Sequence, residues 1–179
     1  MAQLALKSDA PIATAVFRTA AQVESAYEAA VERGYTIGDV NVVMSEDTRR
    51  RLYTQNSEIS SEIGKKAAEG AELGGPTGGR VGIAISIAAA VGAAIALPGL
   101  GFVVAGPIAV ALAGAGAAGL AAGLVSVMAD WGLPEDRQRL YESELSGGGI
   151  LMGVRTRNAE DAGAIARRWT ELGAEHLHH

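Results

Sequence analysis

The sequence predicts an α+β fold: a ferredoxin-like sandwich of two β-α-β units, split by a long Gly/Ala-rich helical-hairpin insertion. Two observations lead to this prediction. Residues 81–129 contain no Asp, Glu, Lys, Arg or His, so every charged side chain lies in the flanking segments. These flanks repeat one strand–helix–strand pattern at a constant offset of 139 residues. Two such units form one four-stranded antiparallel sheet.

The first unit occupies residues 1–45. The segment 12–17 (Ile-Ala-Thr-Ala-Val-Phe) indicates a strand. Thr19 and Gln22 have the spacing of a capping box, which begins a helix, and Gly34 suits its C-terminal end. Residues 39–44 indicate a second strand, joined to the first by a right-handed crossover. Apolar residues that recur along one face of the helix are Val23, Ala26, Tyr27, Ala30 and Val31.

Polar segments connect this unit to the neutral stretch and the neutral stretch to the second unit. Residues 46–79 predict connecting helices that end in a Gly-Gly-Pro hinge at 74–76. On the return side, Pro134 predicts the start of a helix that runs to about Leu145. The chain is therefore expected to comprise four parts: 1–45, 46–79, 80–130 and 131–179.

The neutral stretch predicts two helices, over residues 79–97 and 107–128, joined by Gly- and Pro-containing turns. Small residues recur at every fourth position, which places them in one stripe on each helix, as in a glycine zipper. Another helix backbone can approach such a stripe closely and pack by dispersion. The stripe residues, which are the candidate self-association site, are Gly82, Ser86, Ala90, Ala94, Ala111, Ala115, Gly119 and Gly123.

Two environments suit such a hairpin. Helices of these lengths extend about 28 and 33 Å, close to the roughly 30 Å hydrocarbon thickness of a bilayer. Two crossings would return the chain to the side on which the two halves of the sandwich meet. Alternatively, hairpins of several copies form the interior of a soluble homo-oligomer, because one small sandwich is expected not to cover so long an uncharged hairpin. Trp131 is then either an anchor at the membrane–water boundary or a core residue.

The second unit, in residues 131–179, repeats the pattern of the first. Residues 150–154 indicate a strand, Asn158 caps the following helix, and Gly173 ends it. A short final strand is expected at 174–177. The apolar face of this helix consists of Ala162, Ile165, Trp169 and Leu172.

Composition and motifs argue against several kinds of chemistry. The absence of cysteine excludes thiol chemistry. The net charge of -5 disfavours nucleic-acid binding. Residues 114–119 match GxGxxG, but inside an apolar helix, where the glycines cannot present free N–H groups to a phosphate. His176 and His178 could share a strand face as metal ligands, but a solvated tail is the expected role. No nucleophile or acid/base pair stands out, so neither an enzyme nor a cofactor is expected.

The order of these elements, together with short phrases along nearly the whole chain, resembles the bacterial general stress protein family with a heat-induced YflT-like domain. The resemblance implies a stress-induced bacterial protein and implies neither a substrate nor a cofactor. The phrases are the strand–helix–strand segment of residues 15–44, Leu97-Pro98-Gly99-Leu100-Gly101, Ala105-Gly106-Pro107, Gly132-Leu133-Pro134-Glu135, Tyr141-Glu142 and Gly147-Gly148-Gly149-Ile150-Leu151.

The sequence therefore predicts a non-enzymatic, stress-associated protein that self-associates through its hairpin at or in a membrane. The alternative is a soluble homo-oligomeric assembly with the hairpins in its interior. The expected partners are further copies of the chain and a lipid bilayer, with no nucleic acid. The N-terminus lacks a secretory signal, so the expected location is the cytoplasm, with both termini there if the hairpin enters a membrane.

Overall fold

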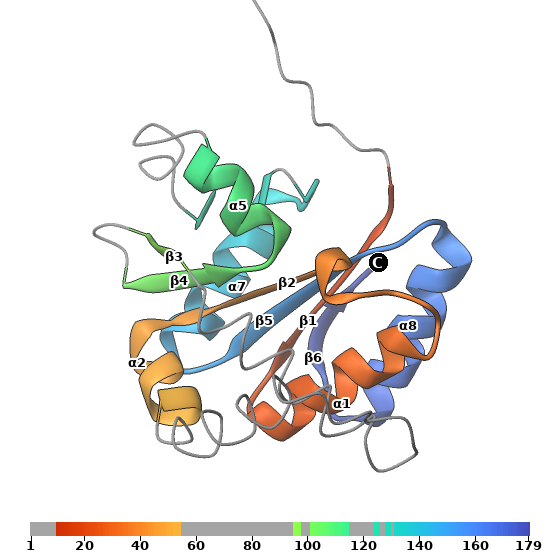
Figure 1. The fold of residues 1–179 in the computed structure, drawn as a ribbon, viewed down its shortest axis with the longest axis horizontal. Helices are drawn as coiled ribbons and strands as arrows, with labels where there is room; N and C mark the ends of the chain where they lie inside the picture. Colours follow the sequence, from red (N-terminus) through yellow and green to blue (C-terminus); the bar gives the residue numbers. More distant parts are fainter. Residues whose placement is uncertain (1–9, 55–94, 98–100, 115–123, 126–127, 130) are drawn as a thin grey trace, which may run out of the picture.

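A computed structural model of the chain describes residues 10–54, 95–97, 101–114, 124–125, 128–129 and 131–179. Within them, mixed helices and strands form one six-stranded antiparallel sheet in the order β3-β4-β2-β5-β1-β6 (Figure 1). The strands are β1 (Ile12–Phe17), β2 (Val40–Ser45), β3 (Ile95–Leu97), β4 (Phe102–Ala105), β5 (Ile150–Arg155) and β6 (Glu175–His178). The helical segments are α1 (Ala20–Val31), η1 (Ile37–Asp39), α2 (Glu46–Arg49), η2 (Arg50–Thr54), α5 (Pro107–Gly114), α7 (Glu135–Ser146) and α8 (Ala159–Glu171).

The four strands that the flanking segments predicted are confirmed, and the two halves of the chain interleave in the sheet. β5 lies between β1 and β2 and pairs antiparallel with both, so Gly153 is opposite Thr14 on one side and Asn41 on the other. β6 lies at the edge beside β1. Neither half therefore completes this part of the sheet without the other.

The prediction of a sheet with only four strands is wrong. β3 and β4 come from the neutral stretch, and β4 continues the sheet by pairing with β2 from Val42 opposite Ala105 to Ser45 opposite Phe102. The first predicted helix of the hairpin therefore cannot extend through residues 95–97. Gly101, with φ +66, directly precedes β4.

Local chemistry sets the ends of the two equivalent helices. The Thr19 side chain accepts from the backbone N–H of Gln22 in a complete capping box, and Asn158 accepts from that of Asp161 at 2.8 Å. After each helix a glycine adopts φ +80, at Gly34 and at Gly173. The N–H groups after these helices bond back to the last turn, as in a Schellman motif. The predicted caps are therefore confirmed.

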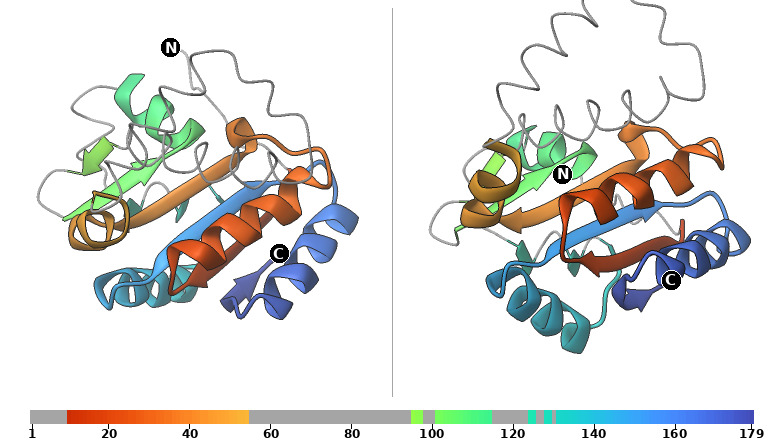
Figure 2. Two further views of the ribbon diagram at one scale, coloured as in Figure 1. Left: turned by 60° about the horizontal axis from the view of Figure 1, so that its bottom comes forward. Right: turned by 90° about the horizontal axis from the view of Figure 1, so that it is seen from below.

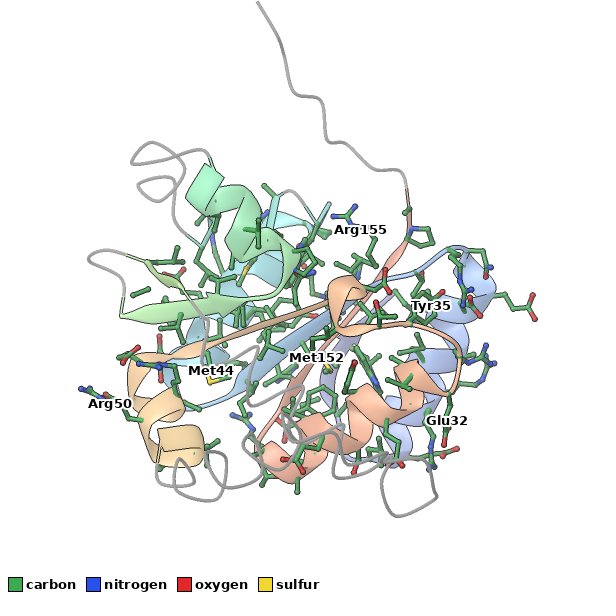
Figure 3. The ribbon with its side chains drawn as sticks, viewed as in Figure 1. Glu32, Tyr35, Met44, Arg50, Met152 and Arg155 are labelled. Atoms are coloured by element: carbon green, nitrogen blue, oxygen red, sulfur yellow. The ribbon has the colours of Figure 1, made fainter. Side chains whose placement is uncertain are left out.

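One face of the sheet is covered by α1 and α8, which lie side by side (Figure 2). The core there includes Phe17 on β1 and Trp169 on α8, whose rings meet edge to face with centroids 5.5 Å apart. Trp169 Nε1 also donates to the Ala26 carbonyl of α1 at 2.9 Å. Met44 and Met152 belong to the same core (Figure 3). This layer joins the first half of the chain to the second.

The opposite face of the sheet has its own apolar core. It is covered by α7, through the buried Tyr141 and Leu145, and by residues of the neutral stretch. The strands consequently bury side chains on both faces, which explains their nearly continuous apolar character.

A polar cluster fastens the end of α1 to the start of α8. The Tyr35 hydroxyl donates to Asp161 Oδ2 at 2.6 Å and accepts from the Arg157 backbone N–H at 3.0 Å. Arg33 bonds the other oxygen of Asp161 at 2.8 Å, and the Arg157 guanidinium lies 4.5 Å from the Tyr35 ring centroid. Tyr35 is visible between the two helices (Figure 3). The hydrogen bond from Tyr35, followed by the nearby arginines, holds the pKa of Asp161 below its ordinary value.

This cluster predicts a loss of stability in acid. A carboxylate with a lowered pKa stabilises the fold above its unfolded pKa, and this contribution disappears as the pH falls through the folded pKa. Replacing Asp161 with Asn should therefore lower the urea midpoint at about pH 6, and the effect should shrink as the pH falls below the ordinary pKa of aspartate, about 3.9. Glu160→Gln is the control, because Glu160 is an exposed residue of the same first turn. Equal pH profiles for wild type and Asp161→Asn would contradict the role of the cluster.

Candidate functional site

The described residues of the neutral stretch form a layer on the second face of the sheet. Ile108 and Ala109 of α5 are buried there, together with Leu124 and Met128, which are also helical. Leu97 and Phe102 of β3 and β4 belong to the same core. The expectation that the sandwich cannot cover the hairpin is therefore wrong for these residues, because their apolar groups are covered by the chain's own sheet. We call α5 with residues 124–125 and 128–129 the hairpin layer.

A close backbone contact fixes α5 to β2. Gly106 has φ +101, and a Cβ at this position would lie 2.3 Å from the Val40 carbonyl oxygen. The buried Asn41 side chain of β2 accepts from the Ile108 N–H at 3.0 Å, which satisfies one free donor in the first turn of α5. Neither the close approach at Gly106 nor the hydrogen bond from Ile108 to Asn41 was predicted from the sequence. The only available signals were Gly directly before Pro107 and one amide inside an apolar strand.

The outer side of the hairpin layer is apolar. α5 has no polar residue, and the described residues that it exposes to solvent are Pro107, Val110 and Gly114. Val110 is 73% exposed, and Val125 in the same layer is 57% exposed. They are two of the three large hydrophobic residues recorded as exposed in the described part of the chain. Exposed apolar surface of this kind is typical of contact sites.

The predicted zipper stripes are largely outside the described residues. Of the stripe residues, Ala111 lies within the described helix α5. Among the described helices, none combines the length and apolar character that a bilayer crossing requires. The stripe residues outside the described part are Gly82, Ser86, Ala90, Ala94, Ala115, Gly119 and Gly123.

Trp131 lies in the core of the second face. It is 5% exposed, and its six-membered ring lies over Gly153 of β5, where a Cβ would approach the ring carbons to 3.1 Å. The sequence left open whether Trp131 is an anchor at a membrane–water boundary or a core residue, and in the structure it occupies the core. Its indole N–H has no hydrogen-bond partner within the described part of the chain.

A second group of polar residues lies where α7 meets β6. Arg18 forms ion pairs with Glu144 and with Glu175, and Glu144 Oε1 lies 3.3 Å from His176 Nε2. Oxygen and nitrogen atoms of Glu144, Glu175 and His176 lie close enough together to hold a metal ion. Arg18 already pairs with both carboxylates, however, so the arrangement is explained as an ion-pair network. The pairing of His176 with His178 that was considered from the sequence is not part of this group.

The arginine run of residues 49–51 has a local role. Arg49 pairs with Glu46 at 2.7 Å and Arg50 pairs with Asp47 at 2.6 Å, each three residues apart in the chain. Arg50 points away from the sheet (Figure 3). These pairs match the solvated helix face that the neighbouring acidic residues predicted.

Scans of the chain against protein-family models, curated proteins and solved structures found no match. The resemblance to the general stress protein family therefore stays a prediction from the sequence. The surface of the hairpin layer is the feature from which a function can be argued.

Proposed function

We propose that the chain is a non-enzymatic protein that self-associates, and that copies meet through the outer side of the hairpin layer. The observation that carries this proposal is the apolar, solvent-facing side of α5, where Val110 is 73% exposed, together with Val125 of the same layer, which is 57% exposed. Its association with stress is proposed from the sequence resemblance alone.

We also propose that the framework under this layer is a ferredoxin-like sandwich. The order β2-β5-β1-β6, with α1 and α8 on one face, supports it. The insertion begins after β2 and returns before β5, so the framework supports the layer from the sheet face that α1 and α8 leave open. On this interpretation β3 and β4 are an extension of the framework.

The second copy is favoured over a bilayer by the position of the hairpin turn. If both predicted helices crossed a membrane, the turn between them would lie on the far side, away from the sandwich. Residues on both sides of that turn instead form β3 and β4, and β4 is paired with β2. A contact between proteins is compatible with this anchoring.

A neutral surface also suits contact with an identical surface. In a symmetric dimer the same patch lies on both subunits, so like charges within it would face each other. Residues 81–129 have no charge, so such a contact meets no repulsion from within this stretch. Burial of the exposed valines would then supply a favourable hydrophobic contribution.

Replacing Val110 with Asp is expected to weaken self-association about tenfold or more, because a carboxylate would lose water without gaining a partner in the contact. Sedimentation velocity over a range of protein concentrations measures the effect. Val31→Asp is the matched control, because Val31 is a 38% exposed valine on α1, outside the hairpin layer. An assembly state that is unchanged in Val110→Asp, or equally changed in both variants, would contradict the proposed surface.

Flotation with phosphatidylcholine vesicles separates the two candidate partners. The proposal predicts a concentration-dependent assembly in plain buffer and no flotation with the vesicles. Flotation that Val110→Asp abolishes, without any assembly in buffer, would instead assign this surface to lipid and overturn contact between copies.

A further inference from the structure

The edge strand β6 is irregular. Its register with β1 shifts between the pair Val16–Glu175 and the pair Thr14–His178. At this irregularity His176 adopts φ +53, the one described residue other than glycine with a positive φ. Such a conformation is uncommon outside glycine, asparagine and aspartate, although histidine tolerates it better than most residues. β6 thus has a bend at His176 that divides it into two parts.

The first part of β6 is held by several contacts. Arg18 Nη2 lies 2.5 Å from Glu175 Oε2, and the same guanidinium pairs with Glu144. The backbone carbonyl of His176 accepts a hydrogen bond from the Tyr141 hydroxyl at 2.7 Å. The His176 imidazole also lies beside Glu144, with its Nε2 atom 3.3 Å from Glu144 Oε1. These contacts fasten the bend to α7.

The second part of β6 has a different response to acid. His178 is opposite Thr14 of β1, which is fully buried, and its own side chain is partly buried. Burial, then Arg137 of α7 and the neighbouring His179, lower the pKa of His178, while Asp136 of α7 opposes the shift. A buried histidine with a lowered pKa stabilises the fold in its neutral form, and this contribution is lost as the pH falls through the unfolded pKa. Thr14 of β1, which is opposite His178, has no group that titrates in this pH range.

We propose that β6 is a pH-sensitive strap hinged at His176: acid releases Leu177 and His178 from β1 while Glu175 and His176 stay attached to Arg18 and α7. Release uncovers the edge of β1 around Thr14. An uncovered strand edge presents unpaired N–H and C=O groups to another strand. The strap is therefore a device that changes the exposure of one sheet edge between neutral and mildly acidic pH, the range in which histidine changes charge. It does not depend on the hairpin layer.

Hydrogen–deuterium exchange of the full chain tests the strap. Deuterium uptake by peptides that cover residues 172–179, corrected for the intrinsic pH dependence of exchange, is measured at about pH 7.5 and about pH 5.5. We expect several-fold faster uptake in acid for wild type. His178→Gln should remove this acceleration, and His179→Gln should retain it. Peptides from β2 and β5 should exchange equally at both pH values, which distinguishes local release from global unfolding.

A second variant tests the hinge. His176→Gln removes the imidazole that lies beside Glu144 and should loosen the bend, so acid should then release the whole of β6 and accelerate exchange at Glu175 as well. The strap is overturned if wild type shows no acceleration in acid, if His178→Gln accelerates like wild type, or if β2 and β5 respond together with β6. It is also overturned if acid accelerates exchange at Glu175 equally in wild type and in His176→Gln, because the bend would then not hold.

Discussion

Replacing Gly106 with alanine is expected to lower the free energy of unfolding by about 3 kcal/mol or more. The added Cβ would lie 2.3 Å from the Val40 carbonyl oxygen and 3.0 Å from Asn41 Cα, both backbone atoms of a central part of the sheet. The φ of +101 adds a conformational cost for any residue with a Cβ. To relieve the clash, α5 must move away from β2. Urea unfolding monitored by circular dichroism measures the change.

Gly163→Ala is the matched control for Gly106→Ala. Gly163 lies inside α8, and a Cβ there meets its nearest neighbour, the Arg167 side chain, at an ordinary 3.7 Å. Alanine favours the helix over glycine, so this variant should be more stable by up to about 1 kcal/mol. If Gly106→Ala is as stable as wild type, the close contact between the start of α5 and β2 is wrong, and the hairpin layer is not anchored to the sheet at this point.

Replacing Trp169 with alanine is expected to lower the free energy of unfolding by about 3–5 kcal/mol. Trp169 is fully buried and is the largest side chain so placed in the described part of the chain. Its loss leaves a cavity beside Phe17 and removes the hydrogen bond from the indole to the Ala26 carbonyl. Because both of these partners belong to the first half of the chain, the variant weakens the joint between the halves. Thermal unfolding by calorimetry measures the loss.

Trp169→Phe separates packing from hydrogen bonding at this joint. It keeps an aromatic ring next to Phe17 but cannot donate to Ala26, so a smaller loss of about 2 kcal/mol is expected. Equal losses for the two variants would show that the hydrogen bond, rather than the buried volume, dominates. A loss below about 1 kcal/mol for Trp169→Ala would contradict the packing of α8 on α1.

The two variants address different parts of one arrangement. Trp169 joins the interleaved halves on the face that α1 and α8 cover, whereas Gly106 attaches the hairpin layer to the other face. The layer thus has two sides with different roles. Its inner side completes the core of the sheet, and its outer side, around Val110, is the surface proposed for contact between copies.

Much of the framework was predictable because it depends on local chemistry. Thr19 and Asn158 cap their helices through side-chain oxygens placed three residues before the N–H groups they bond. Gly34 and Gly173 end those helices because glycine adopts a positive φ at low cost. Both signals are complete within a few residues, so neither needs knowledge of distant parts of the chain.

The candidate site was less predictable. The apolar residues 95–97 could end a helix or form a strand, and their sequence does not distinguish the two. They form a strand because β4 pairs with them and is itself paired with β2. The same holds for Asn41, whose role depends on an N–H that lies 67 residues later in the chain. The solvent-facing Val110 directly follows the buried Ile108 and Ala109 in an entirely apolar helix. The sequence therefore could not show which of these residues would be exposed.

The strands β1, β2, β5 and β6, the caps of α1 and α8, and the neutrality of the inserted stretch could all be predicted, because each follows from nearby residues or from composition. The entry of part of this stretch into the sheet and the position of Trp131 over Gly153 became known only from the folded chain. Strand pairing and packing join residues far apart in the chain. Whether an apolar side chain ends up inside or outside is therefore a property of the assembled fold.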